Sequence, residues 1–209
     1  MSKLEKLIAQ YCPNGVEYKT LGEITYYPKE RIPASKLKAD NYVGVENLLK
    51  DKKGKVDSAC VPNEGNFIEY IIGDLLIGNI RPYLKKIWLA TNNGGTNGDI
   101  LLIRRTESYN TRIATKYLYY LLSSDSFFQY ANQHSKGAKM PRGDRSLISS
   151  YSVPVPPLPV QEEIVRILDT FTKLEAELEA ELEARRKQYE YYRNELLAFG
   201  KIGMGGGGR

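Results

Sequence analysis

Few side chains in this sequence have the types and the spacing that catalysis requires. His134 is the single histidine, and no Ser/Asp or Cys partner stands near it in a recognisable motif, so we interpret it as a loop or surface residue. Asp40 lies eleven residues before Asp51-Lys52-Lys53, a spacing that resembles the carboxylate–lysine pattern of metal-dependent nucleases. Such spacings arise easily by chance in a chain rich in Asp and Lys. We therefore interpret the second segment as a solvated turn.

A second candidate motif is Asn79-Ile80-Arg81-Pro82-Tyr83. It has residue types of the Asn-Pro-Pro-Tyr motif of adenine methyltransferases, but in a different arrangement. No glycine-rich strand–turn–helix pattern for a nucleotide or adenosylmethionine accompanies it, so we predict a turn whose Arg81 faces a ligand. Cys12 and Cys60 form no CxxC pair, and no His/Cys cluster has metal-ligand spacing. The sequence predicts a non-catalytic chain without a metal or cofactor of its own.

Positively charged side chains are the better candidates for binding. Residues 1–159 contain 22 Lys and Arg against 15 Asp and Glu, whereas residues 160–199 contain 6 against 10. A basic body is what phosphate contacts require, although ordinary solubility charge gives a similar excess. The candidate DNA-binding residues are Lys29, Arg31, Lys36, Lys38, Arg81, Lys85, Lys86, Asn92, Asn93, Lys136, Lys139, Arg142 and Arg145. Among them, the asparagines and the residues of the 136–145 loop are best suited to contact base edges, and the others are best suited to contact phosphates.

Short apolar runs between turn signals predict the elements that position these side chains. Helical spacing is found over residues 2–11 and 112–132. Strand-like runs cover residues 16–21, 42–45, 67–72, 74–77, 86–90, 100–103 and 152–155, and loops are predicted at 28–41, 92–98 and 135–145. This order predicts an α/β (α+β) globular domain with a mixed or antiparallel sheet over residues 1–153.

A proline-rich segment then leads into one long helix, predicted over residues 154–200. Prolines suit the first positions of a helix, and we expect Glu162 and Glu163 to lie in its first turn, at the positive end of the helix dipole. A heptad repeat follows in which nine of eleven positions are apolar or aromatic. The repeat, which we call the seam, consists of Ile164, Leu168, Phe171, Glu175, Leu178, Leu182, Arg185, Tyr189, Tyr192, Leu196 and Phe199.

A helix of about 40 residues spans roughly 60 Å and cannot bury this seam against itself, so it needs a partner helix. The remaining residues, 201–209, are too rich in glycine to hold structure and are predicted to form a flexible tail. The charged N-terminus, the lack of a long apolar run and the unpaired cysteines predict a soluble, cytoplasmic protein that does not bind a membrane.

Three motifs of this chain resemble those of specificity (S) subunits of type I restriction-modification systems, in the part called the target recognition domain. The resemblance covers residues 11–199. It rests on Cys12-Pro13-Asn14-Gly15-Val16-Glu17-Tyr18-Lys19-Thr20-Leu21-Gly22-Glu23-Ile24, on Gly73-Asp74-Leu75-Leu76-Ile77, and on Val153-Pro154-Val155-Pro156-Pro157-Leu158-Pro159-Val160-Gln161-Glu162-Glu163-Ile164.

The resemblance implies two recognition domains per subunit, each reading half of a split DNA site, separated by two long antiparallel helices. It also implies that methylation and cleavage belong to separate adenine methyltransferase (M) and restriction (R) subunits, which would hold adenosylmethionine and ATP. This chain departs from the pattern because it has one recognition domain and one helix. We therefore expect an antiparallel homodimer that binds double-stranded DNA with inverted-repeat symmetry. The helix pair would limit the distance between half-sites to about 18 base pairs.

Two alternatives remain at this point. The chain could be a stand-alone dimeric DNA-binding regulator without a methyltransferase partner, although no helix-turn-helix pattern is evident. It could also be a coiled-coil assembly adaptor whose globular part binds protein, which a steep loss of DNA affinity with salt would exclude.

Overall fold

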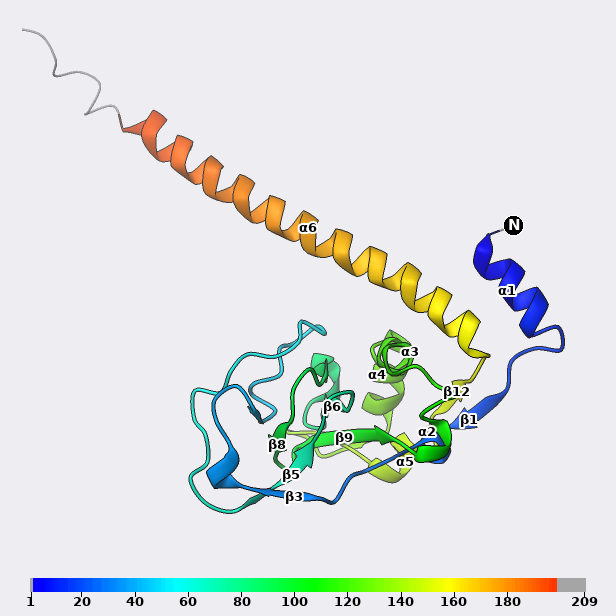
Figure 1. The fold of residues 1–209 in the computed structure, drawn as a ribbon. Helices are drawn as coiled ribbons and strands as arrows, with labels where there is room; N and C mark the ends of the chain where they lie inside the picture. Colours follow the sequence, from blue (N-terminus) through cyan, green and yellow to red (C-terminus); the bar gives the residue numbers. More distant parts are fainter. Residues whose placement is uncertain (1, 199–209) are drawn as a thin grey trace, which may run out of the picture. The chain divides into compact units, whose positions relative to one another are not determined.

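The computed structural model describes residues 2–198 (Figure 1). The chain divides into two compact units, residues 1–165 and a second unit that begins at Arg166. The predicted fold class, a mixed α/β body followed by one long helix, is confirmed. The elements are α1 (Lys3–Tyr11), β1 (Tyr18–Thr20), α2 (Leu21–Ile24), β2 (Thr25–Tyr26), β3 (Arg31–Pro33), the 3-10 helix η1 (Ala34–Lys36), β4 (Tyr42–Val43), β5 (Asn66–Tyr70), β6 (Leu75–Gly78), η2 (Pro82–Leu84), β7 (Ile87–Leu89), β8 (Gly94–Thr96), β9 (Ile100–Arg105), η3 (Glu107–Tyr109), α3 (Thr115–Leu122), α4 (Asp125–Gln133), β10 (Ser135–Lys136), β11 (Arg142–Gly143), α5 (Arg145–Ser149), β12 (Ser152–Pro154) and α6 (Leu158–Leu197).

Two four-stranded sheets form the framework of the first unit. One has the strand order β2-β9-β6-β7 and is antiparallel throughout. The other has the order β3-β5-β8-β4, in which only the β4–β8 pair is parallel. Two smaller pairs, β1–β12 and β10–β11, complete the topology among the described residues.

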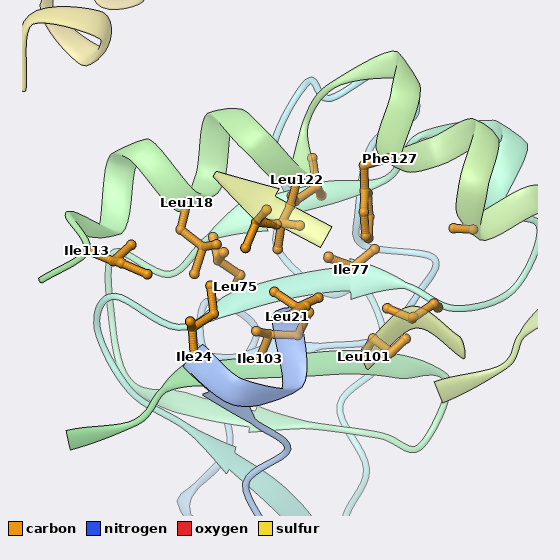
Figure 2. Close-up of a cluster of buried hydrophobic side chains, with 14 of the residues drawn as sticks. Leu21, Ile24, Leu75, Ile77, Leu101, Ile103, Ile113, Leu118, Leu122 and Phe127 are labelled. Carbon is orange, nitrogen blue, oxygen red and sulfur yellow. The ribbon is translucent and has the colours of Figure 1, made fainter. Parts of the chain in front are cut away.

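The strands β6 and β9 are buried on both faces because their side chains alternate between two apolar cores. Leu75 and Ile77 enter the larger core, which α2, α3 and α4 cover (Figure 2). Leu76 enters the smaller core together with Tyr70 and Trp88. Figure 1 accordingly shows α3 and α4 on one side of β9, with β3 and β5 on the other. Continuous apolar runs in these strands follow from this double burial.

Four sequence expectations about local structure are wrong in detail. The predicted helix 112–132 is two helices, because the side chain of Ser124 accepts the backbone N–H of Phe127 and starts α4 anew. The predicted loop 28–41 contains β3 and η1, and the predicted loop 92–98 contains the buried strand β8. The predicted loop 135–145 contains the paired strands β10 and β11. In β8 a Cβ on Gly94 would collide with the carbonyl of Asn41, so glycine permits a close strand contact rather than a turn.

A buried turn joins the two sheets. Gly73 has a positive φ of 91°, and the next residue, Asp74, has a side chain only 2% exposed. The guanidinium of Arg104 donates from Nε and Nη2 to the two carboxylate oxygens of Asp74, at 2.8 and 2.7 Å. Its Nη2 also donates to the carbonyl of Glu69 at 3.3 Å, and the hydrogen bond to Asp74 raises the pKa of Arg104. This pair therefore holds β9 of one sheet against β5 of the other.

The start of α6 is held to the body by a buried amide. Gln161 is fully buried, and its Nε2 donates to the carbonyls of Arg112 and Pro156, at 2.8 and 2.7 Å. Its Oε1 accepts the backbone N–H of Ala114 at 2.9 Å. The amide side chain thus satisfies three backbone groups that would otherwise be buried without partners.

The expectation that Glu162 and Glu163 lie in the first turn of this helix is wrong. The helix begins at Leu158, after the predicted start at residue 154, and its first turn ends before Glu162 and contains no acidic residue. Glu163 is instead buried, and its carboxylate accepts a hydrogen bond from the ammonium group of Lys3 on α1 at 2.8 Å. Glu163 therefore binds α1 and does not lie at the positive end of the helix dipole.

Candidate nucleic-acid interface

A short hairpin formed by β10 and β11 packs against the turn that begins with Asn79. The backbone N–H of Arg81 donates to the carbonyl of Pro141 at 2.8 Å, and Gly143 donates to the carbonyl of Asn79 at 3.1 Å. Ile80 and Arg142 form an isolated β-bridge between the two segments. The candidate motif at residues 79–83 and the basic loop at 135–145 therefore form one structural piece.

A third segment, Gly98-Asp99, joins them through side chains. Arg142 Nη2 lies 2.9 Å from Asp99 Oδ1, and Arg145 Nη2 donates to the carbonyl of Gly98 at 3.2 Å. The guanidinium of Arg145 also lies 5.8 Å from the ring centroid of Tyr27. The surface on which these segments meet, here called the hairpin surface, carries five exposed cations: Arg81, Lys136, Lys139, Arg142 and Arg145.

Local packing explains why the hairpin surface has this form. Asp144 starts α5, because its Oδ1 accepts the backbone N–H of Ser146 at 3.0 Å. A hydrogen bond from Lys136, at 2.7 Å, lowers the pKa of Asp144 and raises that of Lys136. A Cβ on Gly143 would lie 2.8 Å from both Asn79 Oδ1 and Ile148 Cδ1, so the hairpin needs glycine there to approach the core.

The five cations of the hairpin surface differ in their freedom to bind an anion. Lys136 and Arg142 are each held by a carboxylate of the chain. Within residues 2–198, the side chains of Arg81 and Lys139 make no ion pair. Arg81 lies directly before η2, and its backbone has the left-handed conformation, with φ of 54°. Arg81 and Lys139 are therefore the cations most available for a phosphate.

Two other predicted cations already have partners inside the chain. Lys85 Nζ lies 2.8 Å from Asp125 Oδ1, and its hydrogen bond lowers the pKa of that carboxyl. Lys86 Nζ donates to the carbonyl of Val45 at 2.7 Å, and burial lowers the pKa of Lys86. Both contacts join different parts of the body, so these lysines have a structural role that their sequence positions did not indicate.

The two predicted asparagines also support backbone. Asn93 Oδ1 accepts the N–H of Ile72 at 2.8 Å, and Asn92 Nδ2 donates to the carbonyl of Asp40 at 3.1 Å. These bonds shape the loops around β8. Paired hydrogen bonds from these amides to a base would compete with the bonds they already make.

The remaining predicted cations lie along an edge strand. Arg31 belongs to β3, the outermost strand of its sheet, and Lys36 to η1 directly after it. Lys29 and Lys38 flank the two elements, and all four side chains are exposed. Tyr27, two residues before Lys29, donates its hydroxyl to the carbonyl of Arg145 at 3.1 Å. The first part of this edge therefore adjoins the hairpin surface.

Sequence reasoning missed the apolar residues of this region. Tyr83 and Met140 are both about half exposed, at 51% and 52%, and they flank Arg81 and the hairpin. Asn79 Oδ1 is buried and has no hydrogen-bond partner among the described residues. The sequence did contain a signal for Tyr83, because this tyrosine is the last residue of the motif that begins with Asn79.

Neither a metal centre nor a membrane span is found in the described part of the chain. Within residues 2–198, no group of three or more His, Cys, Asp or Glu side chains could hold a metal ion. None of the helices in the same range is both long and apolar enough to cross a membrane.

The long helix carries the predicted seam. Phe171, Leu178, Leu182, Tyr189, Tyr192 and Leu196 are exposed on α6. Ile164 and Leu168 are half-buried, and Ile164 packs against the larger core of the body. Phe199 and the glycine-rich tail at 201–209 lie outside the described residues.

Several solved structures share this fold. The crystal structure of the HsdS subunit from Thermoanaerobacter tengcongensis matches with a TM-score of 0.60 and 24% identity, covering 88% of this chain and 48% of that chain. A type I restriction-modification S subunit from M. genitalium matches with a TM-score of 0.56 and 14% identity, covering 90% of this chain and 48% of that one. At these identities the likeness shows the fold.

Sequence comparison shows the family. The specificity subunit of the Escherichia coli type I restriction enzyme EcoR124I/EcoR124II is 32% identical over 210 residues, 95% of this chain and 48% of that protein. A putative type I specificity subunit of Mycoplasma pneumoniae is 41% identical over 160 residues, 73% of this chain and 42% of its own length. The chain thus spans about half the length of the curated relatives it matches. A family model described as the type I restriction modification DNA specificity domain matches residues 13–184, and the chain belongs to that family.

Proposed function

We propose that this chain is a DNA sequence-specificity subunit of a type I restriction-modification enzyme that works as an antiparallel homodimer. Each copy would bind one half of a bipartite double-stranded site. The dimer would then direct adenine methyltransferase and restriction subunits to that site in the cytoplasm. The chain would contribute recognition only, because adenosylmethionine and ATP would be held by those partners.

One observation carries the homodimer. Large apolar side chains repeat along α6, and they are exposed: Phe171 by 64%, Leu178 by 66% and Leu196 by 68%. A continuous apolar stripe of this kind marks an interaction surface. A second copy of the chain would supply an identical stripe. Its recognition domain would take the place of the second half that the longer relatives contain. In this proposal residues 1–153 recognise DNA, and residues 154–200 are the spacer and dimer segment, of which Leu158–Leu197 form α6.

The DNA contact is assigned to the hairpin surface and the adjoining β3 edge. Arg81 and Lys139 would neutralise phosphates, because each has a charged end without an ion pair in the described part of the chain. Arg142 and Arg145 have the fork of donors that can pair with O6 and N7 of guanine. Each guanidinium has five N–H donors, so the ion pair of Arg142 with Asp99 and the contact of Arg145 with the carbonyl of Gly98 orient the side chains and leave other donors for a base.

Replacing Arg81 and Lys139 together by alanine is expected to weaken binding to all duplex sequences alike. Each lost phosphate contact lowers the slope of log K against log salt by about 0.9, so the slope falls by about 2. We expect affinity at physiological salt to fall by at least roughly tenfold. Titration of a fluorescent duplex at several salt concentrations measures both quantities.

The matched control replaces Lys6 on α1 and Lys173 on α6 by alanine, which removes the same charge outside the hairpin surface. It is expected to leave the salt slope unchanged. Equal losses in both double variants would assign the effect to net charge and would remove the hairpin surface from the proposed interface. A wild-type chain without salt-dependent DNA binding would contradict the proposed function itself.

A further inference from the structure

The seam of α6 contains two charged residues, Glu175 and Arg185, among its otherwise apolar or aromatic members. They are equally distant from Ala180, one five residues before it and the other five residues after it. All other described seam positions are placed around Ala180 in the same way. The symmetric pairs are Leu178 with Leu182, Phe171 with Tyr189, Leu168 with Tyr192, and Ile164 with Leu196.

From this symmetry we propose that the dimer has one defined register, with its two-fold axis at the level of Ala180, and that Glu175 pairs with the partner's Arg185. The inference rests on the proposed antiparallel homodimer and adds its register. By two-fold symmetry the ion pair forms twice. Every apolar seam residue in the described part of the chain then lies opposite another apolar residue, which is the arrangement that knobs-into-holes packing requires.

Other arrangements of the two helices leave charges without partners. A shift by one heptad in one direction would put Glu175 against Leu178 and Arg185 against Leu168. A shift in the other direction would put Glu175 against Tyr192 and Arg185 against Leu182. A parallel pair would bring each charged residue next to its own copy, so that like charges meet. Unpaired or like charges at a packed seam are costly, so each alternative is disfavoured.

The isolated chain leaves both residues available for this pair. Arg185 lies 3.6 Å from Glu181 and 3.3 Å from the side-chain oxygen of Gln188, contacts within one turn of an exposed helix. Exposed pairs of this type contribute little, so a better partner can replace them. Within residues 2–198, Glu175 makes no ion pair. Polar residues at single seam positions are a recognised means of fixing register in coiled coils.

The register also sets the spacing of the two recognition domains. Because the two-fold axis lies at residue 180, equal lengths of helix separate it from each body. A shift by one heptad would change the separation by about 10 Å, or roughly three base pairs. The ion pair would therefore specify the length of the spacer between the two half-sites without touching DNA.

Charge exchange tests the register directly. Glu175→Arg and Arg185→Glu are each expected to raise the dimer dissociation constant roughly 100-fold, about tenfold for each of two symmetric pairs. An equimolar mixture of the two variants is expected to regain the wild-type dissociation constant as a heterodimer, because every charge then faces its opposite. The chain that carries both exchanges is expected to dimerise like the wild type. Sedimentation equilibrium measures all four samples.

Glu183→Arg and Lys187→Glu are the matched controls. These residues form an ion pair at 2.7 Å on the same helix but outside the seam, so they carry the same charge changes. Both controls are expected to dimerise like the wild type. Single exchanges at 175 and 185 that leave the wild-type dimer unchanged would overturn the register while the homodimer stands. A wild-type chain that remains monomeric would overturn the homodimer and the register together.

Discussion

Replacing Leu178 and Leu182 together by lysine is expected to convert a dimer of about twice 23.7 kDa into a monomer of that mass. The two leucines would face each other next to the two-fold axis, so the variant brings four ammonium groups into the centre of the seam. Each buried leucine contributes about 1.5–3 kcal/mol, so the loss over the four leucines amounts to about 6–12 kcal/mol before charge repulsion is added. Light scattering of the purified chains gives the mass directly.

The control for this experiment places lysine at Ala176 and Ala180, which lie on α6 outside the seam. It adds two positive charges per chain, as the double leucine variant does, and is expected to remain a dimer. DNA affinity should fall in the variant that becomes a monomer, because a monomer loses the gain in effective concentration that links two half-sites. A wild-type monomer would contradict the proposed homodimer, since the seam would then require a different partner.

Asp74→Ala is expected to lower the free energy of unfolding by about 3–5 kcal/mol. The substitution leaves the guanidinium of Arg104, whose side chain is only 16% exposed, without its two charged hydrogen bonds. It also removes the acceptor of the Ile71 N–H at 2.9 Å. For a chain of this size the expected fall in melting temperature is roughly 6–20 °C. Urea unfolding followed by circular dichroism measures the change.

A double-mutant cycle separates this ion pair from ordinary packing. Arg104→Met removes the other partner, and the double variant Asp74→Ala/Arg104→Met is expected to lose much less than the sum of the single losses. Strict additivity, or a loss below about 1 kcal/mol for Asp74→Ala, would contradict a role for this pair in joining the two sheets. The Gly73-Asp74 motif is thus explained by stability rather than by DNA contact.

Local signals predicted much of the fold. Apolar runs located β6, β7 and β9, and the heptad repeat located α6, because both depend on residues close in the sequence. The break between α3 and α4 depends on Ser124, which caps the start of α4 although the surrounding sequence has continuous helical spacing. The strand β8 was missed because its glycines matter only when the chain around Asn41 lies against them. Such contacts depend on residues far apart in the chain.

The same distinction applies to the candidate interface. Charge alone selected Lys85 and Lys86 as readily as Arg81, and no local feature showed that Asp125 and the carbonyl of Val45 bind the two lysines. Sequence reasoning did place Arg81 in a turn, but it predicted a basic loop at 135–145 where the structure has the β10–β11 hairpin. Only the fold brings the turn and the hairpin together. Gln161 belongs to the motif that leads into the long helix, and its three backbone partners explain its place there.

In the proposed function, two copies of this chain read one symmetric, split DNA site. Selection of bound duplexes from a random library by the purified wild-type chain, followed by sequencing, tests it most directly. We predict enrichment of two copies of one half-site in inverted orientation, separated by a fixed spacer of no more than about 18 base pairs. The Leu178→Lys/Leu182→Lys variant should enrich a single half-site. An unrepeated site for the wild type, or no enrichment at all, would contradict recognition of a symmetric split site by two copies.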